Sequence, residues 1–337
     1  MTLVMRDSRD TDYALMLAAA SLPKARTELS PANVDNPVVN DLSRTLQPVI
    51  AGRRRAICCH SGTLSGRFPP NSLAGVAECV EARAPRVEVD VCFMADDAML
   101  IFHDAGLDPS TSRSGKVADL TRADLADVRY RWGSSHGLCF LEDVVDLVRG
   151  SATMLQVDLK LMRPITDRRA EALQTALKPL SGNVIVGSQA HWNLRSLVRV
   201  PIAFDPTLQW HYDPERTFAE ALPRTLGIHG LWDDAPIAVI RHATPETYAE
   251  SRIRDIRALL PAAVEWMVDF ATIFRLAEFG VALGDRLREE GCALAAWTVR
   301  EDTPSRRDVV QRLYALGTEI IITDAPLLVA EDAAAAL

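Results

Sequence analysis

The chain has 337 residues, of which 48% are hydrophobic, so it can bury a large core in one big α/β domain or in two smaller ones. Its formal net charge of −8 is opposite to the basic surface that nucleic acids and anionic membranes attract, and we expect no nucleic-acid partner. The six cysteines show no Cys-x-x-Cys spacing, which indicates reduced thiols.

Residues 1–50 read as an N-terminal extension that consists of a helix over 12–20 and a proline-punctuated linker. The apolar stretch over 13–22 is too short for a membrane span, and the acidic residues ahead of it are atypical of a signal peptide. The sequence therefore predicts a cytoplasmic protein without stable membrane insertion.

The first buried strand is predicted over residues 56–60 and ends at His60. The basic run 53–55 before it is interpreted as a solvated edge. A loop then leads into a helix over 73–84, which either Asn71 or Ser72 can cap.

The segment 87–91 alternates valines with two carboxylates. Side chains at i and i+2 of a strand share a face, so Glu88 and Asp90 point the same way. Two buried carboxylates need compensation, and a divalent cation is the simplest one. Salt bridges to Arg83 or Arg86 are the alternative.

The chain is then predicted to double back in a β-hairpin with the four-residue loop 95–98. This pairing places residue 94 opposite 99 and His103 opposite Asp90. An imidazole beside two metal-binding carboxylates indicates acid–base chemistry next to a metal-bound substrate.

Residues 141–148 have helical spacing, and a strand follows over 154–160. Alternation places Asp158 and Lys160 on one face of this strand, so a third carboxylate lies near a strand end. The alternative is that these two residues form an ordinary ion pair.

The strand–helix rhythm continues to the C-terminus, and eight parallel strands are predicted in all. They cover residues 56–60, 87–91, 154–160, 183–189, 201–207, 264–270, 293–299 and 319–324. Eight is the number that closes a TIM (β/α)₈ barrel, here over residues 51–332. The connection 208–262 is too long for a barrel loop and is predicted to be an inserted lid.

If the barrel is correct, the active-site candidates lie at the carboxyl ends of its strands: His60, Glu88, Asp90, Asp158, Lys160 and Trp297. Three carboxylates suit Mg²⁺ or Ca²⁺, whereas no set of Cys or His ligands suggests zinc. Two histidines and a lysine fit phosphate-ester chemistry.

At this point the sequence resembles the glycerophosphodiester phosphodiesterase family. The motifs that carry the resemblance are, in order, His60, Pro70-Asn71-Ser72, Glu88-Val89-Asp90, Phe102-His103-Asp104, Asp158-Leu159-Lys160, Ala296-Trp297-Thr298-Val299 and Ile322-Thr323-Asp324-Ala325-Pro326. The resemblance implies a TIM barrel with Mg²⁺ or Ca²⁺ on Glu88, Asp90 and Asp158, and with His60 and His103 as the acid–base pair. It further implies that Lys160 contacts the phosphate of a small phosphodiester substrate, with Trp297, Ser61 and Asn71 as further binding candidates.

The sequence departs from the family pattern in three places, because Ser61 replaces an arginine, Pro70 a glutamate and Asp158 a glutamate. The related venom-type phospholipases D share the first and third changes. A lyase or phosphotransferase that forms a cyclic phosphate, and a non-catalytic binding relative, are therefore alternatives to a hydrolase. The oligomeric state stays open.

Overall fold

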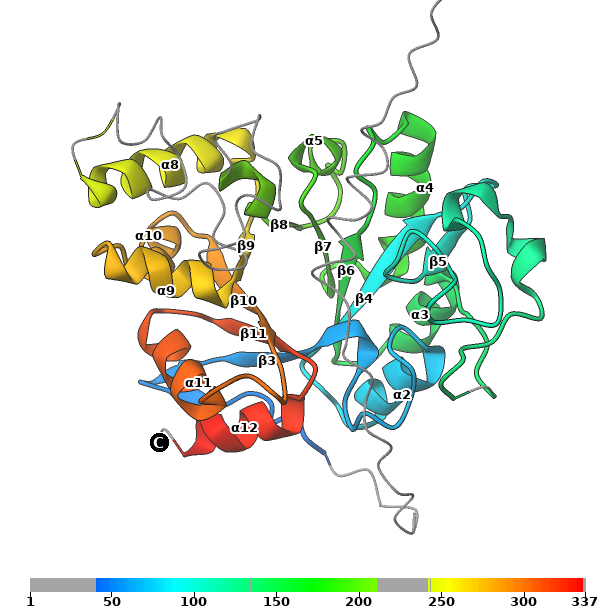
Figure 1. Ribbon diagram of the computed structural model, residues 1–337, viewed down its shortest axis with the longest axis horizontal. Coiled ribbons are helices and arrows are strands. Elements are labelled where there is room, and N and C mark those ends of the chain that lie inside the picture. The colour runs from blue at the N-terminus through cyan, green and yellow to red at the C-terminus, as the bar shows by residue number, and fades with distance from the viewer. Residues whose placement is uncertain (1–40, 134, 211–241, 243, 336–337) are drawn as a thin grey trace, which may run out of the picture.

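The computed structural model describes residues 41–133, 135–210, 242 and 244–335, and its central feature is a closed barrel of eight parallel strands (Figure 1). The barrel strands are β3 (Ala56–Cys59), β4 (Arg86–Phe93), β6 (Met154–Leu159), β7 (Val184–Ser188), β8 (Ile202–Phe204), β9 (Glu265–Asp269), β10 (Ala293–Val299) and β11 (Ile320–Thr323). The barrel closes where β3 pairs with both β4 and β11. The predicted TIM barrel is confirmed.

Helices surround the barrel and bury most of its outer face. They are α2 (Leu73–Glu81), α3 (Leu141–Val148), α4 (Asp167–Leu177), α5 (His191–Leu194), α8 (Pro245–Leu259), α9 (Phe270–Glu278), α10 (Leu283–Glu289), α11 (Arg306–Ala315) and α12 (Pro326–Ala334). Short 3₁₀ turns add η1 (His60–Gly62), η2 (Val117–Asp119), η3 (Arg122–Leu125), η4 (Lys178–Leu180) and η5 (Thr207–Trp210). Figure 1 shows α3 and α4 on one side of the barrel and α8 to α12 on the other.

The helix predicted from residue 73 begins there because Ser72 caps it. The Ser72 hydroxyl accepts a hydrogen bond from the backbone N–H of Gly75, at 3.2 Å. Apolar side chains of α2 and of the other helices pack on the outside of the strands, where they form one large hydrophobic core. This core fixes the strand ends that carry the polar residues.

The inside of the barrel holds a smaller apolar cluster and a buried ion pair. The guanidinium of Arg86 donates to both carboxylate oxygens of Glu265, at 2.7 and 2.8 Å, and to Gln156 Oε1 at 2.9 Å. Arg83 contacts Asp41 at 3.1 Å. The salt-bridge alternative for Glu88 and Asp90 is therefore wrong, because both arginines are paired with other carboxylates.

The predicted hairpin exists, but its register differs by one residue. Strand β5 (Met99–Ile101) pairs antiparallel with β4, and Phe93 lies opposite Met99 and Val91 opposite Ile101. The loop contains three residues rather than four, because Asp97 adopts the left-handed conformation (φ 63°), which an aspartate tolerates, and Met94 N–H donates to Ala98 O. His103 consequently lies beyond β5 rather than opposite Asp90.

Two predicted segments fall largely outside the described residues. Of the extension 1–50, only 41–50 is described: there Leu46 is fully buried, and β1 (Val49–Ile50) pairs with β2 (Arg53–Arg54). Of the insertion 208–262, residues 211–241 and 243 are not described, and α8 occupies 245–259. The extension and the lid stay predictions.

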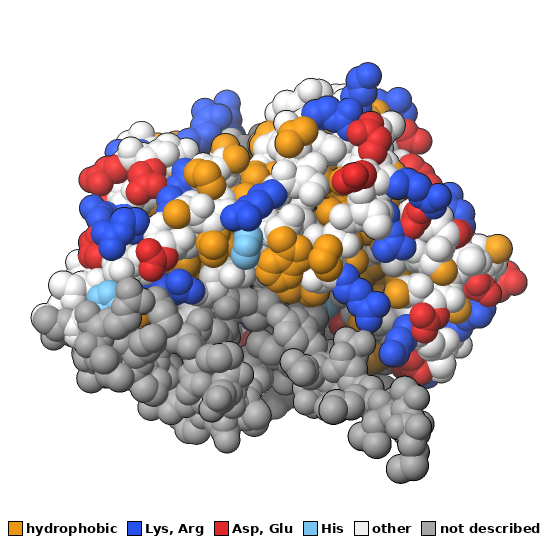
Figure 2. Space-filling model, turned by 90° about the horizontal axis from the view of Figure 1, so that it is seen from above, with side chains coloured by type: hydrophobic (Ala, Val, Ile, Leu, Met, Phe, Trp, Pro, Cys, Tyr) orange, Lys and Arg blue, Asp and Glu red, His pale blue; other side chains and the backbone are white. Residues whose placement is uncertain are grey.

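The six cysteines are all free and buried, as expected for reduced thiols. No helix in the described part of the chain has the length and apolar character needed to cross a membrane. On the face drawn in Figure 2, acidic and basic side chains are interspersed around groups of apolar ones, without a broad field of one sign.

Candidate active site

Three carboxylates meet near the carboxyl ends of two neighbouring strands. The parallel register of β4 and β6 pairs Asp90 with Asp158, and Glu88 lies two residues earlier on the same face of β4. One oxygen atom from each of the three residues lies within 4.8 Å of the others. Glu88 is 2% exposed and Asp90 is fully buried. The structure thus brings together the three carboxylates that were predicted from the sequence to lie close to one another.

The ammonium group of Lys160 compensates part of this negative charge. Its Nζ atom lies 2.7 Å from Asp158 Oδ2, with hydrogen-bond geometry, and 3.0 Å from Asp90 Oδ1, a contact whose angles do not make a hydrogen bond. Burial alone would lower the pKa of Lys160, but Asp158 and Asp90 raise it well above its ordinary value. The ion pair with Asp158 therefore exists, and it is part of the carboxylate cluster.

The single positive charge of Lys160 does not balance the charge of three carboxylates. Burial and the neighbouring Asp90 raise the pKa of Glu88 to about 8, although His60 opposes this shift. Burial would also raise the pKa of Asp90, but Lys160, then His103 and His60, hold it below its ordinary value. Glu88 Oε1 is buried and has no hydrogen-bond partner in the described part of the chain. This arrangement leaves oxygen atoms available to a further cation.

His60 follows directly after β3 and opens the turn η1. Its Nδ1 atom lies 2.6 Å from Asp324 Oδ1, and its Nε2 atom lies 3.8 Å from Glu88 Oε2. Burial would lower the pKa of His60, but Asp324 and Glu88 raise it to about 9. The imidazole is therefore held on one nitrogen by Asp324 and faces the carboxylate cluster with the other.

His103 lies in the bend that follows β5. Its Nδ1 atom lies 2.8 Å from Asp104 Oδ1, and a third of its side chain is exposed. The backbone N–H of Phe102 donates to Asp90 O at 3.0 Å, so Phe102, not His103, lies opposite Asp90. His103 is nevertheless near enough to help lower the pKa of Asp90.

Ser61 and Asn71 hold the carboxylates in place. Ser61 donates from its backbone N–H to Glu88 Oε2 at 2.7 Å and from its hydroxyl to Asp90 Oδ2 at 3.2 Å. Asn71 donates from Nδ2 to Asp90 Oδ2 at 2.6 Å and accepts the Asp90 backbone N–H at 3.0 Å. Both residues have a positive φ, 48° and 59°, and Asn71 N–H donates to Ser61 O. Their contact with substrate stays a prediction.

Trp297 lies near the end of β10, where it pairs in register with Asp269. It is partly buried and packs against the apolar cluster inside the barrel. Its indole N–H is buried and has no hydrogen-bond partner among the described residues. The predicted contact of Trp297 with substrate stays a prediction.

The sequence interpretation missed the partners of the two histidines, Asp104 and Asp324. Strand pairing contains a signal for Asp324: Thr323 pairs with Cys59, so the next residues along β11 and β3 are Asp324 and His60. Arg300 was also missed, and its Nε atom lies 3.6 Å from Asp324 Oδ2. These contacts appear only once β3, β10 and β11 are neighbours in a closed barrel.

Comparison with known proteins agrees with this geometry. Residues 60–199, which include both histidines and all three carboxylates, match the model of the glycerophosphoryl diester phosphodiesterase family. A glycerophosphodiester phosphodiesterase of Bacillus altitudinis is 28% identical over 110 residues, which are 31% of this chain and 44% of that protein. YhdW of Bacillus subtilis is 21% identical over 276 residues, which are 82% of this chain and 97% of that protein.

A solved structure supports the fold. It is a phosphodiesterase of Oleispira antarctica in complex with the product sn-glycerol-3-phosphate, and it superposes with a TM-score of 0.53 at 15% sequence identity. The superposition covers 82% of this chain and 95% of the other. At this identity the similarity concerns the fold of the barrel.

Proposed function

We propose that this chain is a member of the glycerophosphodiester phosphodiesterase family, whose model matches residues 60–199, and that it is a metal-dependent hydrolase of a small phosphodiester. The observation that carries the proposal is the cluster of three carboxylates at the barrel mouth, with an imidazole of His60 facing it and His103 nearby. Such a cluster suits a substrate whose phosphate needs positive charge and proton transfer at the same place.

The donor set of Glu88, Asp90 and Asp158 fits Mg²⁺ or Ca²⁺, which prefer oxygen ligands. The buried, unpartnered Glu88 Oε1 supports this fit, since a carboxylate oxygen without a donor is costly in a dry site. When bound, the cation supplies positive charge that stabilises the phosphoryl oxygens as charge develops on them. Lys160, which contacts both aspartates, would add a second positive charge for the phosphate.

His60 and His103 are proposed to transfer the protons. Each imidazole has its Nδ1 atom on a carboxylate, Asp324 or Asp104, which leaves Nε2 for chemistry. One Nε2 accepts the proton of the attacking hydroxyl group, and the other donates a proton to the oxygen of the departing alcohol. The carboxylate partners fix the orientation of both rings, and Asp324 also raises the pKa of His60.

The substrate is proposed to be a glycerophosphodiester or a close analogue. The Oleispira antarctica phosphodiesterase is described with sn-glycerol-3-phosphate as its product, which supports a glycerol group on one side of the phosphate. Ser61 stands where the family pattern has an arginine, and its hydroxyl donates to Asp90. A serine cannot clamp a phosphate in a bidentate manner, so we expect weaker selection for the substrate phosphate here.

Ser61 and Asp158, the two departures shared with the venom-type phospholipases D, favour a second candidate reaction. In this reaction a neighbouring hydroxyl group of the substrate displaces the alcohol, and a cyclic phosphate is released. Phosphorus NMR of the products distinguishes the two reactions, because the cyclic ester has its own resonance. A cyclic phosphate that persists identifies a lyase. A phosphomonoester as the only product identifies a hydrolase.

The test of the proposed function is a screen of glycerophosphodiesters with Mg²⁺, Ca²⁺, Mn²⁺ or EDTA. We expect turnover that EDTA abolishes and that His60→Ala and His103→Ala each reduce by at least about 10²-fold, the usual contribution of a positioned acid or base. His136→Ala is the control, because His136 packs on Phe68 and contacts none of the carboxylates in the described structure. Near-normal rates in both histidine variants, or phosphodiester binding without turnover across the screen, would contradict the proposal.

A further inference from the structure

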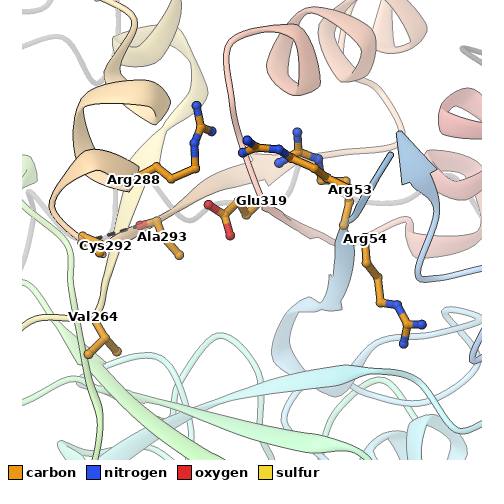
Figure 3. Close-up of a pocket in the computed structure, with 9 residues that line it drawn as sticks. Arg53, Arg54, Val264, Arg288, Cys292, Ala293 and Glu319 are labelled. Atoms are coloured by element: carbon orange, nitrogen blue, oxygen red, sulfur yellow. Dashed lines mark hydrogen bonds between the residues drawn. The ribbon is translucent and has the colours of Figure 1, made fainter. Parts of the chain in front are cut away.

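A second polar pocket opens at the end of the barrel opposite the carboxylate cluster. Its volume is about 480 Å³, and its lining comes from the starts of strands β3, β9, β10 and β11 and the segments just before them. The charged lining residues are Arg53, Arg54, Arg55, Arg288 and Glu319. Figure 3 shows Arg288 and Arg53 on either side of Glu319, whereas the Arg54 side chain points away from it. Four arginines and one carboxylate make this pocket strongly cationic.

Arg55 is the unusual member of this group. The sequence predicted a solvated edge for residues 53–55, and Arg53 and Arg54 are exposed, but Arg55 is only 6% exposed. Its Nε atom is buried and has no hydrogen-bond partner among the described residues. Burial lowers the pKa of Arg55, Glu319 opposes this shift, and Arg53 and Arg288 add to it. An arginine is thus kept from water beside two other positive charges.

Of the other arginines that line the pocket, only Arg288 has an acidic partner among the described residues. Arg54 donates to Gln47, which is uncharged, and Arg288 pairs with Asp285 on its own helix. Arg53 has no ion pair within the described ranges. Glu319 is the only acidic residue among those that line the pocket. An anion from outside the chain would offset the positive charge of this pocket.

We propose that this pocket binds a small molecule that carries a phosphate or diphosphate group. Guanidinium groups match phosphate oxygens in a bidentate geometry, and four arginines line this pocket. The volume is in the range of ligand pockets and exceeds what a single inorganic ion needs, so a phosphorylated organic molecule fits better than a free ion. The site is separate from the carboxylate cluster, since the two lie at opposite ends of the barrel.

The test measures binding of pyrophosphate to the full chain by titration calorimetry, with EDTA present so that no metal recruits the probe to the carboxylate cluster. We expect saturable binding of one equivalent. Arg53→Ala and Arg288→Ala should each weaken it by at least about tenfold, the loss expected for a charged hydrogen bond. Both side chains are on the surface, so these variants avoid the buried Arg55, whose replacement risks the fold.

Arg149→Ala is the matched control. Arg149 is a surface arginine that ends α3 and precedes β6, at the same end of the barrel, but it does not line the pocket. Equal loss of binding in Arg149→Ala and in the two pocket variants would overturn the proposal, and so would absence of saturable binding together with failure of the lipid test that follows.

A parallel arm distinguishes a soluble ligand from a lipid headgroup. It measures co-sedimentation of the chain with phosphatidylcholine vesicles that contain phosphatidic acid. Co-sedimentation that depends on Arg53 and Arg288 supports the site with a lipid phosphate as its ligand. Pyrophosphate binding without co-sedimentation supports it with a soluble ligand. Failure of both arms refutes the site, and because no substrate or metal is involved, it leaves the proposed phosphodiesterase activity untouched.

Discussion

At the scale of single residues, each candidate catalytic histidine is paired with an aspartate through Nδ1. His60 Nδ1 lies 2.6 Å from Asp324, and His103 Nδ1 lies 2.8 Å from Asp104. The two pairs differ in burial, because a quarter of the His60 side chain and a third of the His103 side chain are exposed. At the more buried imidazole, burial opposes the charged form, but Asp324 and Glu88 raise the pKa of His60 to about 9.

Asp324→Asn should lower the pKa of His60 in the metal-free protein, because burial then acts with less opposing charge. Because the pKa of His60 is raised, its protonated form stabilises the fold fully below about pH 6.5, and this contribution disappears as the pH rises through about 9. Between these pH values, the free energy of unfolding of Asp324→Asn should therefore fall less than that of the unmodified chain. NMR titration of the His60 ring in EDTA gives the pKa, and denaturant unfolding across the pH range gives the stability.

Asp104→Asn provides the control, because it removes the same group beside His103 and leaves Asp324 in place. An unchanged His60 pKa in Asp324→Asn would show that Asp324 does not control the protonation of His60. A comparable fall in Asp104→Asn would show that the shift is a general effect of charge at the barrel mouth.

The sequence predicted the carboxylates better than their surroundings. Alternation along a strand was enough to place Glu88, Asp90 and Asp158 near each other, since a barrel brings equivalent strand positions together. The pairing of Asp324 with His60 depends on the closure of β11 onto β3, which no local pattern encodes. The positive φ of Ser61 and Asn71 likewise follows from tertiary contacts, because neither position is a glycine.

At the scale of elements, helix α2 packs very closely on the turn η1 that carries His60. A methyl group on Gly75 of α2 would lie 2.6 Å from the carbonyl oxygen of Gly62, a distance at which the backbone must move. Gly62 ends the same turn that presents His60 and Ser61. The glycine at position 75 therefore controls the position of the candidate catalytic turn.

Gly75→Ala should lower the free energy of unfolding by about 1–3 kcal/mol, the usual effect of overpacking, and should also lower kcat/KM by shifting η1. Gly284→Ala is a matched control: its methyl group would lie 2.5 Å from Leu316 O, a similar clash between α10 and the end of α11. We expect similar destabilisation but near-normal kcat/KM for the folded protein. Urea unfolding and initial rates measure the two effects, and equal losses of activity would refute the role of Gly75.

The elements themselves were largely predictable from periodicity. The helix 141–148 matches α3, and the strand 293–299 matches β10. The hairpin register was wrong by one residue, because it depends on the left-handed conformation of Asp97 rather than on the apolar pattern. Because of this error, His103 was predicted to lie opposite Asp90, whereas the structure has Phe102 there.

At the scale of the whole molecule, the two ends of the barrel carry opposite charge. The carboxyl ends of β4 and β6 hold the acidic cluster, and the segments before β3, β10 and β11 hold the arginine-lined pocket. The pocket was not predictable, because its lining comes from segments more than 200 residues apart that meet only when the barrel closes. Both sites therefore depend on the closure of the barrel. A cation bound at the carboxylate cluster, or an anion bound in the pocket, should stabilise the closed barrel.

The proposed metal should stabilise the fold, and more strongly at high pH. Without a cation, the raised pKa of Glu88 means that its favourable neutral form is lost as the pH rises through about 8, so the fold loses stability over this range. Mg²⁺ or Ca²⁺ binds the ionised form, and a cation at 100 times its Kd adds about 2.7 kcal/mol. The gain should thus be larger at pH 9 than at pH 6, as thermal unfolding in EDTA and in excess cation can measure.

Glu88→Gln tests whether this stabilisation acts through the carboxylate. The amide has nearly the same shape and does not ionise, so the variant should fold, bind the cation weakly and lose the difference between pH 6 and pH 9. Stabilisation by Mg²⁺ or Ca²⁺ that is equal in Glu88→Gln and in the unmodified chain would place the cation elsewhere. Stabilisation that falls as the pH rises would contradict a site built on ionised carboxylates, because protons and the cation compete for the same oxygens.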